Sequence, residues 1–324
     1  MYDNMVLEAG VDILFHTRMA DVTMADDGTV DFITVANKNG LTDYKAKVYI
    51  DCTGDGDLAT WAGADYFQGD DDDTVQDSTL CFTVAGVNHE EFTRLGGRIQ
   101  DGNSESLIHK ILATGKYPLL DRHFNVKMVH PGVLVFNAGH IPGVDSTDPV
   151  SLSLGMVQGR RVVEQLHGAL IEESPELFGQ SFLASTGSIL GIRESRRIKC
   201  DYVFTVDDWV ARRSFADDIG RNCYYIDVHK TGARKYPRYG KGESHGIPFR
   251  TLQPEKLTNV LIAGRSISSD DDAYGSLRIM PVCMVTGEAA GIGASMASRS
   301  DRVDIHNIDV DHLRRRLREM GQNI

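Results

Sequence analysis

The chain has 324 residues, of which 41% are hydrophobic and 25% charged, a size that suits one large domain or two ordinary ones. Its formal net charge of −12 at pH 7 argues against a nucleic-acid partner, which normally requires a basic surface. Its five cysteines are scattered and form no C-x-x-C pair, which argues against a disulfide framework or a zinc site and favours a reducing, cytoplasmic location.

The first fifty residues read as one helix followed by short strands. An amphipathic pattern predicts a helix that ends at Gly10. The turn sequences ADDG and NKNG are typical of hairpins, so the strands around them predict a three-stranded meander. The expected strands are 11–17, 18–24, 29–37 and then 46–53. This order is typical of half of a nucleotide-binding α/β domain.

The pattern changes between residues 65 and 253 and then returns to α/β order. Strands are expected over 78–87, 131–141 and 223–229, and helices over 89–97, 153–173 and 175–185. A strand over 259–264, a polar loop and helices over 281–298 and 309–320 complete the chain. The most apolar run, 279–297, contains Glu288 and three glycines. It falls short of the ~20 apolar residues that span a bilayer, so no membrane association is expected.

A glycine-rich turn with an unusual charge follows the expected strand 46–53. Gly54 to Ala59 spells G-x-G-x-x-A, and its variable positions include Asp55 and Asp57. A calcium-binding EF-hand loop is excluded, because position 12 is Ala62 and a strand precedes the loop. A dinucleotide fingerprint is disfavoured, because each carboxylate about 4 Å from a phosphate would cost roughly 4 kcal/mol.

Two interpretations of this turn stay open. In the first, the turn lies beside a nucleotide held elsewhere, and Asp55 and Asp57 cap a helix that starts near Leu58 or accept hydrogen bonds from ribose hydroxyls. In the second, it is only a turn between a strand and a helix, with capping aspartates.

Six long motifs, in the same order, resemble a known family. The sequence is similar to the FAD-dependent oxidoreductases of the glutathione-reductase-like flavoprotein superfamily, the family FAD_oxidored. The resemblance runs from about Glu8 to Ala297. Its motifs occupy 8–22, 46–64, 191–202, 224–229, 247–268 and 275–297.

The resemblance implies an α/β fold: a partial FAD-binding Rossmann-like domain and a second, mixed α+β substrate domain. The implied boundaries are an FAD-binding domain over 1–70 and 254–300, a substrate or cap domain over 71–253, and a C-terminal helix over 301–324. FAD is the implied cofactor, and no metal is expected. The implied FAD-binding residues are Met19, Thr53, Gly54, Asp55, Gly264, Arg265, Ser266, Arg278, Ile279 and Met280.

One part of the family pattern is missing. The family starts with a strand, a G-x-G-x-x-G turn and a helix, and residue 1 corresponds to the family's middle. The sequence is therefore interpreted as an N-terminally truncated form, whose missing segment would hold most of the affinity for the diphosphate. A separate chain encoded upstream, or a second copy, is the partner that this interpretation allows.

Three residues are predicted to be catalytic: Arg193, His229 and Tyr274. In GIRESRR, Arg193 would clamp a substrate carboxylate; the alternative is an internal ion-pair network. On the expected strand 223–229, Tyr225, Asp227 and His229 would share one face, so that His229 could transfer protons. His245 is a weaker candidate, and Asp70 to Asp73 read as a solvated loop.

The sequence thus predicts an FAD-dependent oxidoreductase that transfers a hydride or electron pair between a small molecule and flavin. The alternative is a non-catalytic fragment or subunit, which needs a partner chain with the G-x-G-x-x-G half to bind FAD.

Overall fold

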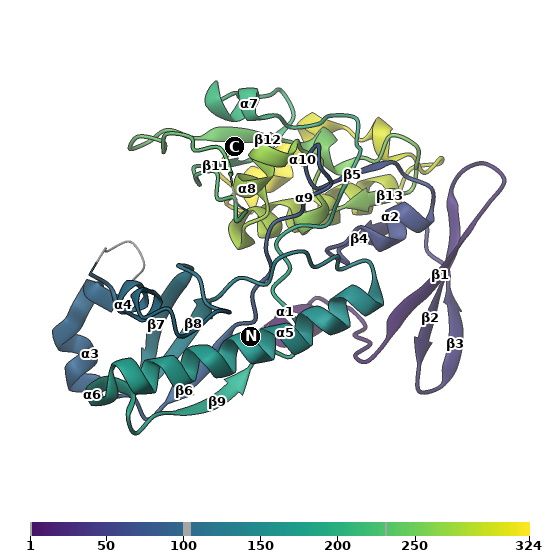
Figure 1. Ribbon diagram of the computed structural model, residues 1–324. Helices are drawn as coiled ribbons and strands as arrows, with labels where there is room; N and C mark the ends of the chain where they lie inside the picture. The colour runs from purple at the N-terminus through teal and green to yellow at the C-terminus, as the bar shows by residue number, and fades with distance from the viewer. Residues whose placement is uncertain (1, 100–104, 231) are drawn as a thin grey trace. The chain divides into compact units, whose positions relative to one another are not determined.

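The computed structural model describes residues 2–99, 105–230 and 232–324, and it divides into two compact units. Unit 1 comprises Met1–Phe67, Arg196–Asp227 and Arg234–Ile324, and unit 2 comprises Gln68–Ser195 and Val228–Ala233. Both units mix helices and strands, which confirms the expected α/β class (Figure 1).

Unit 1 contains most of the helices and short strands of the chain. Its strands are β1 (Arg18–Met24), β2 (Val30–Asn37), β3 (Gly40–Tyr44), β4 (Tyr49–Asp51), β5 (Tyr66–Gln68), β10 (Arg196–Ile198), β11 (Asp218–Asn222), β12 (His245–Pro248) and β13 (Val260–Ile262). Its α-helices are α1 (Tyr2–Glu8), α2 (Asp57–Trp61), α7 (Val206–Val210), α8 (Asp271–Leu277), α9 (Met280–Ala297) and α10 (Val310–Glu319). Short 3-10 helices are η2 (Phe249–Leu252), η3 (Gly264–Ser266) and η4 (Ile305–Asn307).

The meander of unit 1 differs in one strand from the expected one. Strands β1, β2 and β3 form an antiparallel sheet in that order, and the NKNG turn joins β2 to β3. The third strand is therefore 40–44, and the expectation of a strand over 11–17 was wrong. The tight turn at Gly40 supplies a neighbouring strand directly, whereas the backbone of 11–17 ends in a left-handed residue, His16, with φ of 52°.

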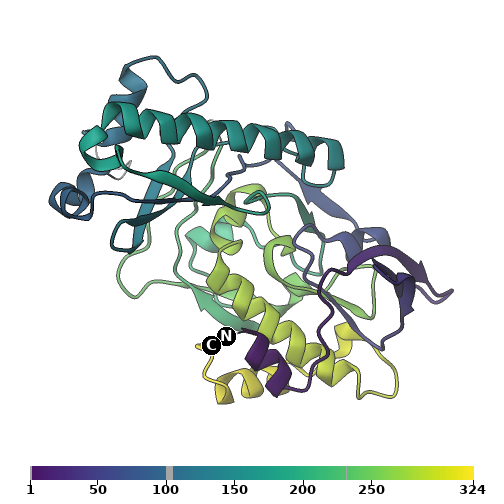
Figure 2. The same ribbon diagram turned by 90° about the horizontal axis from the view of Figure 1, so that it is seen from below.

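Strands β4 and β13 form a parallel pair, with Val260 opposite Tyr49 and Ile262 opposite Asp51. Parallel strands carry the loops that follow them at the same edge of the sheet. Helix α9 contacts both strands, and α10 packs against α9 (Figure 2). The turns that follow Asp51 and Ile262 therefore lie at the same edge, the carboxyl ends of β4 and β13.

The segments between 196 and 253 bury their apolar side chains in the core of unit 1. Ile198, Trp209 and Phe249, each at most 1% exposed, belong to the same core cluster as Leu261 and Leu313. Because these segments pack into that core, the structure places 196–227 and 234–253 in unit 1. The boundaries expected from the sequence placed all of 71–253 in one domain.

Unit 2 is a four-stranded antiparallel sheet with helices against it. The strand order is β7-β8-β6-β9, and the long helix α5 runs along the sheet (Figure 1). Its strands are β6 (Phe82–Ala85), β7 (Phe124–His130), β8 (Val133–Ala138) and β9 (Phe182–Thr186). Its helices are α3 (His89–Leu95), η1 (Gly96–Ile99), α4 (Leu107–Ala113), α5 (Pro149–Glu173) and α6 (Pro175–Phe178).

Two elements between residues 175 and 229 were predicted wrongly. The helix expected over 175–185 ends at Phe178, and its second half is the strand β9, because the alternating segment finds a partner in β6. The strand expected over 223–229 lies earlier, at 218–222, where it pairs with β12. Residues 223–229 belong to no strand or helix.

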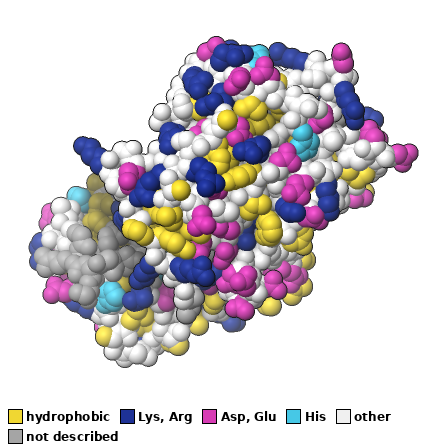
Figure 3. Space-filling model, turned by 90° about the horizontal axis from the view of Figure 1, so that it is seen from above, with side chains coloured by type: hydrophobic (Ala, Val, Ile, Leu, Met, Phe, Trp, Pro, Cys, Tyr) yellow, Lys and Arg dark blue, Asp and Glu magenta, His cyan; other side chains and the backbone are white. Residues whose placement is uncertain are grey.

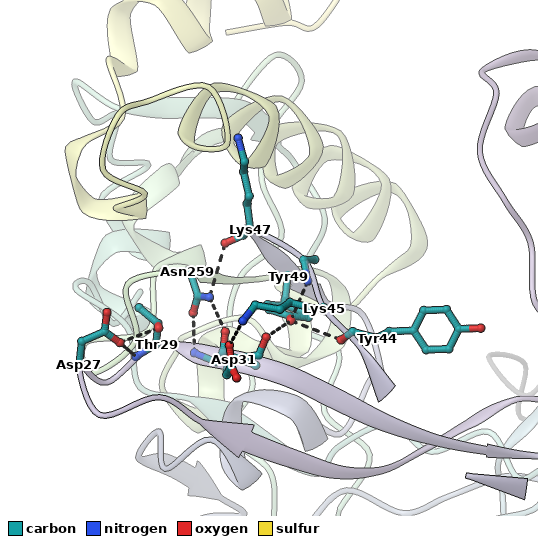
Figure 4. A network of polar contacts seen from close by, with 10 residues as sticks. Asp27, Thr29, Asp31, Tyr44, Lys45, Lys47, Tyr49 and Asn259 are labelled. Atoms are coloured by element: carbon teal, nitrogen blue, oxygen red, sulfur yellow. Dashed lines mark hydrogen bonds and ion pairs between the residues drawn. The ribbon is translucent and has the colours of Figure 1, made fainter. Parts of the chain in front are cut away.

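A polar network fixes the amino ends of β4 and β13, opposite the edge that carries the turns (Figure 4). The Asn259 side chain accepts a hydrogen bond from Val30 N at 2.9 Å and donates to the Val30 carbonyl at 2.9 Å, so it joins β2 to β13. The cavity beside it has a volume of about 390 Å³ and is lined by charges of both signs, including Asp31 and Lys45. Ligands of open parallel sheets bind at the carboxyl ends of strands, so we assign this network to folding.

Among the described residues, no single helix has the length and apolar character needed to cross a membrane. Helices α8 and α9 have that length and apolar character only when they are taken together, and a bend of 86° separates them. Acidic and basic side chains are interspersed on the face drawn in Figure 3.

Helix α8 clamps the segment before residue 228, and this contact requires a glycine. A Cβ atom at Gly275 would lie 2.9 Å from the main-chain nitrogen and oxygen of Asp227. We expect Gly275→Ala to lower the free energy of unfolding by about 1–3 kcal/mol. Gly291→Ala in α9, where a Cβ would meet nothing within 4 Å, should leave stability unchanged or raise it by about 0.5–1 kcal/mol. Urea unfolding of both variants checks this; equal effects would contradict it.

Candidate functional site

The carboxylate of Asp51 organises the first turn. Asp51 is 1% exposed, and its Oδ1 accepts hydrogen bonds from Thr53 N at 3.0 Å and Thr53 Oγ1 at 2.7 Å. Its Oδ2 accepts from Ala59 N at 2.9 Å, in the first turn of α2. Thr53 Oγ1 in turn accepts from Asp57 N at 2.9 Å. Asp51 and Thr53 therefore satisfy the amides at the start of α2, a role that the sequence pattern had suggested for Asp55 and Asp57.

Asp55 and Asp57 are instead paired with arginines from distant parts of the chain. Asp55 Oδ1 lies 2.9 Å from Arg265 Nη2, and Asp57 Oδ1 lies 3.1 Å from Arg196 Nη2. Burial raises the pKa of the Asp57 carboxyl, although Arg196 lies beside it. These pairs explain the charge of the turn: each carboxylate neutralises a cation within unit 1.

The second turn, Gly264 to Ser266, meets the first one. A Cβ atom at Gly54 would lie 2.8 Å from Arg265 Nη2, so the glycine with φ of 85° lets the two turns touch. Gly264 has φ of 84°, and the nearest atom to a Cβ there is Cys283 Sγ at 4.0 Å, so its main chain borders open space. Ser266 is fully buried, and its Oγ has no hydrogen-bond partner among the described residues.

Tyr274 forms a hydrogen bond with the main chain of this second turn. Its side chain is 0% exposed, and its hydroxyl donates to the Arg265 carbonyl at 2.8 Å. The guanidinium of Arg197 lies over its ring, 5.5 Å from the centroid. An enclosed hydroxyl that binds a main-chain carbonyl holds the turn in place, which indicates a structural role in place of the predicted catalytic one.

Helix α9 starts next to the second turn. Gly264 N donates to Thr286 Oγ1 in α9 at 3.0 Å. Ile279 is the N-cap and makes no side-chain cap bond, and the Met280 side chain is 76% exposed. Arg278 Nη2 donates to the Asp227 carbonyl at 2.7 Å. Unit 1 thus brings α9 next to the second turn. The binding of FAD by Arg278, Ile279 and Met280 stays a prediction.

Met19 lies on β1, a strand that contacts α2, and packs partly buried against the core of unit 1. Its predicted place at the FAD site stays a prediction.

The GIRESRR motif serves both units. Arg193 is 7% exposed, and its Nη1 donates to the Asp77 carbonyl at 2.5 Å and to Thr79 Oγ1 at 2.7 Å, within unit 2. Arg196 and Arg197 belong to unit 1, where Arg197 Nε donates to the Ser269 carbonyl at 3.1 Å. The buried contacts of Arg193 favour the internal network over the carboxylate clamp.

Three histidines of unit 2, His123, His140 and His229, form a cluster. His140 Nε2 lies 2.9 Å from His229 Nδ1, and His140 Nδ1 lies 2.5 Å from Asp121 Oδ2. The His123 ring stacks on His140, with centroids 4.2 Å apart and planes within 7°. Ligand atoms of the three rings lie within 4.8 Å of one another.

The electrostatics of this cluster differ between its members. Burial, together with the charges of His140 and Arg193, lowers the pKa of His123 to about 3, so this ring is neutral. Burial opposes ionisation of Asp121, but the hydrogen bond and charge of His140 outweigh it, and the pKa of Asp121 is below its ordinary value. Asp121 is therefore a carboxylate that faces the Nδ1 of His140.

The predicted neighbours of His229 lie elsewhere. Tyr225 and Asp227 belong to unit 1, and His229 belongs to unit 2, so the expectation of one shared strand face was wrong. The reason is that 223–229 is not a strand and passes from one unit to the other. His245 is fully buried; its Nδ1 contacts the Gly246 carbonyl at 2.9 Å and its Nε2 contacts Asn222 Nδ2 at 3.2 Å, which indicates a structural role.

Asp121, His123 and His140 were not predicted from the sequence. The signal was present in the hairpin: β7 and β8 pair Phe124 with Ala138, and Gly139 N donates to the His123 carbonyl at 2.8 Å. A hairpin over these two runs brings the residue before β7 next to those after β8.

The comparison with protein families gives a match over most of the chain. A family model with the description FAD dependent oxidoreductase matches residues 1–317. No curated relative matches the sequence.

Solved structures give weaker likenesses. The structure of BexE, from a study of oxidation during BE-7585A biosynthesis, matches with 12% identity, a TM-score of 0.44 and coverage of 98% of this chain and 46% of the other. A geranylgeranyl bacteriochlorophyll reductase-like protein from Thermoplasma acidophilum matches at 10% identity, a TM-score of 0.42, and coverage of 98% and 56%. The p-nitrophenol 4-monooxygenase PnpA from Pseudomonas putida matches at 9% identity, a TM-score of 0.40, and coverage of 99% and 53%.

This chain therefore spans about half the length of these solved structures. Their likeness adds nothing to the family assignment, which follows from the family model alone.

Proposed function

This chain belongs to the FAD dependent oxidoreductase family, and we propose that it transfers a hydride or an electron pair between a small molecule and FAD. FAD is the cofactor of this family. The observation that carries the proposal is the contact between the two glycine turns at the carboxyl edge of β4 and β13, where Arg265 Nη2 meets Asp55 Oδ1 at 2.9 Å.

The residues at this edge fit the flavin end of FAD. The main chain at Gly264 borders open space, so a flat ring can approach it. The buried Oγ of Ser266 has no partner among the described residues, and a buried hydroxyl normally has one. The start of α9 has no side-chain cap, so its free amides and positive dipole end favour an anionic ligand group. Gly264, Ser266 and Ile279 would hold the flavin end.

The first turn does not fit the diphosphate of FAD. Its carboxylates Asp55 and Asp57 already neutralise Arg265 and Arg196, so no net positive charge is left for a phosphate. A phosphate here would instead meet two carboxylates, each of which costs roughly 4 kcal/mol at about 4 Å. The diphosphate therefore needs a binding site that the described residues do not provide.

A partner segment at β4 would supply that site. In the parallel ladder, Tyr49 N donates to the Asn259 carbonyl at 2.9 Å and Ala263 N donates to the Asp51 carbonyl at 3.0 Å. The N–H and C=O of Ile50, between them, point to the opposite edge, and β4 pairs with β13 alone among the described strands. Parallel strands are rarely left open, because their faces and edges are normally covered. The exposed Met280 and Met284 lie on the adjoining helix α9.

An added segment tests whether a partner segment at β4 supplies the site for the diphosphate. A strand–G-x-G-x-x-G–helix segment, taken from an intact member of the family and fused or added in trans, should raise the affinity for FAD well above that for riboflavin. The control is the same segment with valine in place of its glycines. If the native segment leaves the ratio of the two affinities unchanged, this part of the proposal fails.

FAD would supply the acceptor of the hydride or electron pair, and a side chain of the protein would take up a proton that the substrate releases. His229 suits this task, because it lies in a cluster of polar, partly exposed groups and belongs to the residue type that titrates near neutral pH. We assign to His229 the role of substrate-side acid–base residue.

Ser266 allows a sharp test of flavin binding. Removal of a buried hydroxyl that has no partner should leave the unfolding free energy unchanged or raise it slightly, whereas the loss of its bond to the flavin should weaken binding about 2- to 10-fold. Flavin fluorescence titration of Ser266→Ala measures the affinity, and urea unfolding measures the stability. Ser268→Ala, also buried but bonded to Cys200 N at 3.3 Å, is the matched control, because it should lower stability and leave flavin affinity unchanged.

A further inference from the structure

A loop of unit 1 has the opposite charge to the rest of the chain. Residues 234–243, in the connection between β11 and β12, read RKYPRYGKGE, with four basic residues and one acidic residue. The whole chain has 46 acidic and 34 basic residues. We call residues 234–243 the basic loop; they belong to no helix or strand. A local excess of positive charge on an acidic protein attracts anionic groups to that place.

Two tyrosines fix the basic loop to the core of unit 1. The Tyr239 ring stacks on that of Trp209, with centroids 4.3 Å apart, and Trp209 is 1% exposed. The Tyr236 hydroxyl donates to Asp272 Oδ2 on α8 at 2.6 Å. Both tyrosines are partly buried against the core cluster of unit 1. The loop is therefore held at positions 236 and 239, and Pro237 between them restricts its backbone further.

The remaining cations of the loop point to solvent between these fixed points. Lys235, Arg238 and Lys241 are all exposed, and none forms a hydrogen bond or ion pair with any residue that the structure describes. Arg234 in the same loop, by contrast, pairs with Asp272. The three cations are spaced three residues apart, so they form a row of at most about 20 Å. A row of this length suits a short acidic segment.

Arg238, the central cation, lies on a stack of aromatic rings. Its guanidinium carbon is 4.2 Å from the centroid of the Tyr225 ring, and Tyr225 stacks on Tyr224 with centroids 4.5 Å apart. The Tyr224 carbonyl accepts hydrogen bonds from Trp209 Nε1 at 3.2 Å and Ser276 Oγ at 2.8 Å, which tie the stack to unit 1. A guanidinium that stacks by its face keeps its N–H groups at its edge, where they can bind a carboxylate with two hydrogen bonds.

We propose that the basic loop is a docking surface for an exposed acidic segment of a partner protein, with Arg238 as the central contact and Lys235 and Lys241 on either side of it. Arginine and tyrosine side chains that are already held in place lose little conformational freedom on binding, and such residues dominate the energy of many protein interfaces. The two lysines add electrostatic attraction during the encounter. This surface goes beyond the proposed function and does not depend on FAD.

The charge of the whole chain favours a protein over other anionic partners. Exposed charges are screened beyond about 8 Å at physiological ionic strength, so a compact acidic segment that covers the basic loop interacts mainly with its cations. A nucleic acid or an anionic membrane extends past the loop and meets the rest of a chain whose formal net charge is −12. The expected partner therefore has an acidic segment about as long as the loop.

The test is the fluorescence anisotropy of a labelled hexaglutamate peptide, titrated with the full chain. We expect saturable binding that weakens as sodium chloride is added, because the attraction is between exposed charges. Arg238→Gln should raise the Kd about 3- to 10-fold, because a carboxylate loses its two-pronged partner. Arg315→Gln is the matched control: it removes the same charge from an exposed position of α10 and should leave the Kd unchanged.

Three results would overturn the inference. The first is the absence of saturable binding, and the second is an equal loss of affinity in Arg238→Gln and Arg315→Gln, which would show that only the overall charge matters. The third is tighter binding of a hexanucleotide or of phosphatidylserine vesicles, which would assign the loop to a nucleic acid or a membrane. If Arg238→Gln does not fold, the double variant Lys235→Gln/Lys241→Gln, compared with Arg315→Gln/Arg318→Gln, decides in the same way.

Discussion

Replacement of His229 by alanine should slow reduction of the bound flavin by about 10²- to 10⁴-fold, because a positioned acid–base residue contributes roughly that factor. Flavin affinity should be unchanged, because Gly264, Ser266 and Ile279, and not His229, are the residues proposed to hold the flavin. The measurement is anaerobic bleaching of the flavin absorbance, with the small molecule that reduces the native protein fastest.

The control for this prediction is His167→Ala. His167 lies on α5 in the same unit and contacts Ser181 Oγ, but it lies outside the histidine cluster. It should retain the native rate within about threefold, the scatter that we allow for indirect effects. A native rate in His229→Ala would remove this residue from the proposed reaction, and equal losses in both variants would point to damage of unit 2.

Replacement of Asp51 by alanine should lower the free energy of unfolding of unit 1 by about 2–4 kcal/mol. The carboxylate is 1% exposed and accepts three hydrogen bonds, one of them from the amide of the fully buried Ala59. That amide would lose its partner in a place that water does not reach. The start of α2 and the turn before it would loosen together.

Tryptophan fluorescence follows this unit selectively, because both tryptophans, Trp61 and Trp209, lie in unit 1. The matched control is Asp43→Ala on the exposed strand β3, where one hydrogen bond from Thr34 Oγ1 is lost and the expected change is about 0.5 kcal/mol. A change below about 1 kcal/mol for Asp51→Ala would contradict the role that we give to this carboxylate.

The parts of the fold that depend on local pattern could be predicted from the sequence. The strand that ends at Asp51, the strand that ends at Ile262 and the helix after Ile279 were confirmed in order and type. Each has an apolar run with glycine or proline at one end. The segment 223–229 was predicted as a strand because its apolar and polar residues alternate, but it forms no strand. The same alternation suits an extended segment that bonds to a helix, and Ser276 Oγ of α8 donates to the Tyr224 carbonyl.

The chemistry of the site was harder to predict, because it depends on contacts between distant residues. Nothing in the local sequence indicates that Asp55 pairs with Arg265 or Asp57 with Arg196. The same holds for His140, which meets His229 from another part of unit 2. His229 was chosen from its motif, whereas Asp121 and His140 follow from the register of the β7–β8 hairpin.

The most direct test of the central claim is a fluorescence titration of this chain with FAD and with riboflavin. The flavin end fits the turns at Gly264 and Ser266, and the diphosphate does not fit the turn at Asp55. We therefore predict saturable binding of both compounds with similar affinity, weakened equally in Ser266→Ala. Absence of saturable binding to the folded chain would contradict the claim that these turns hold a flavin.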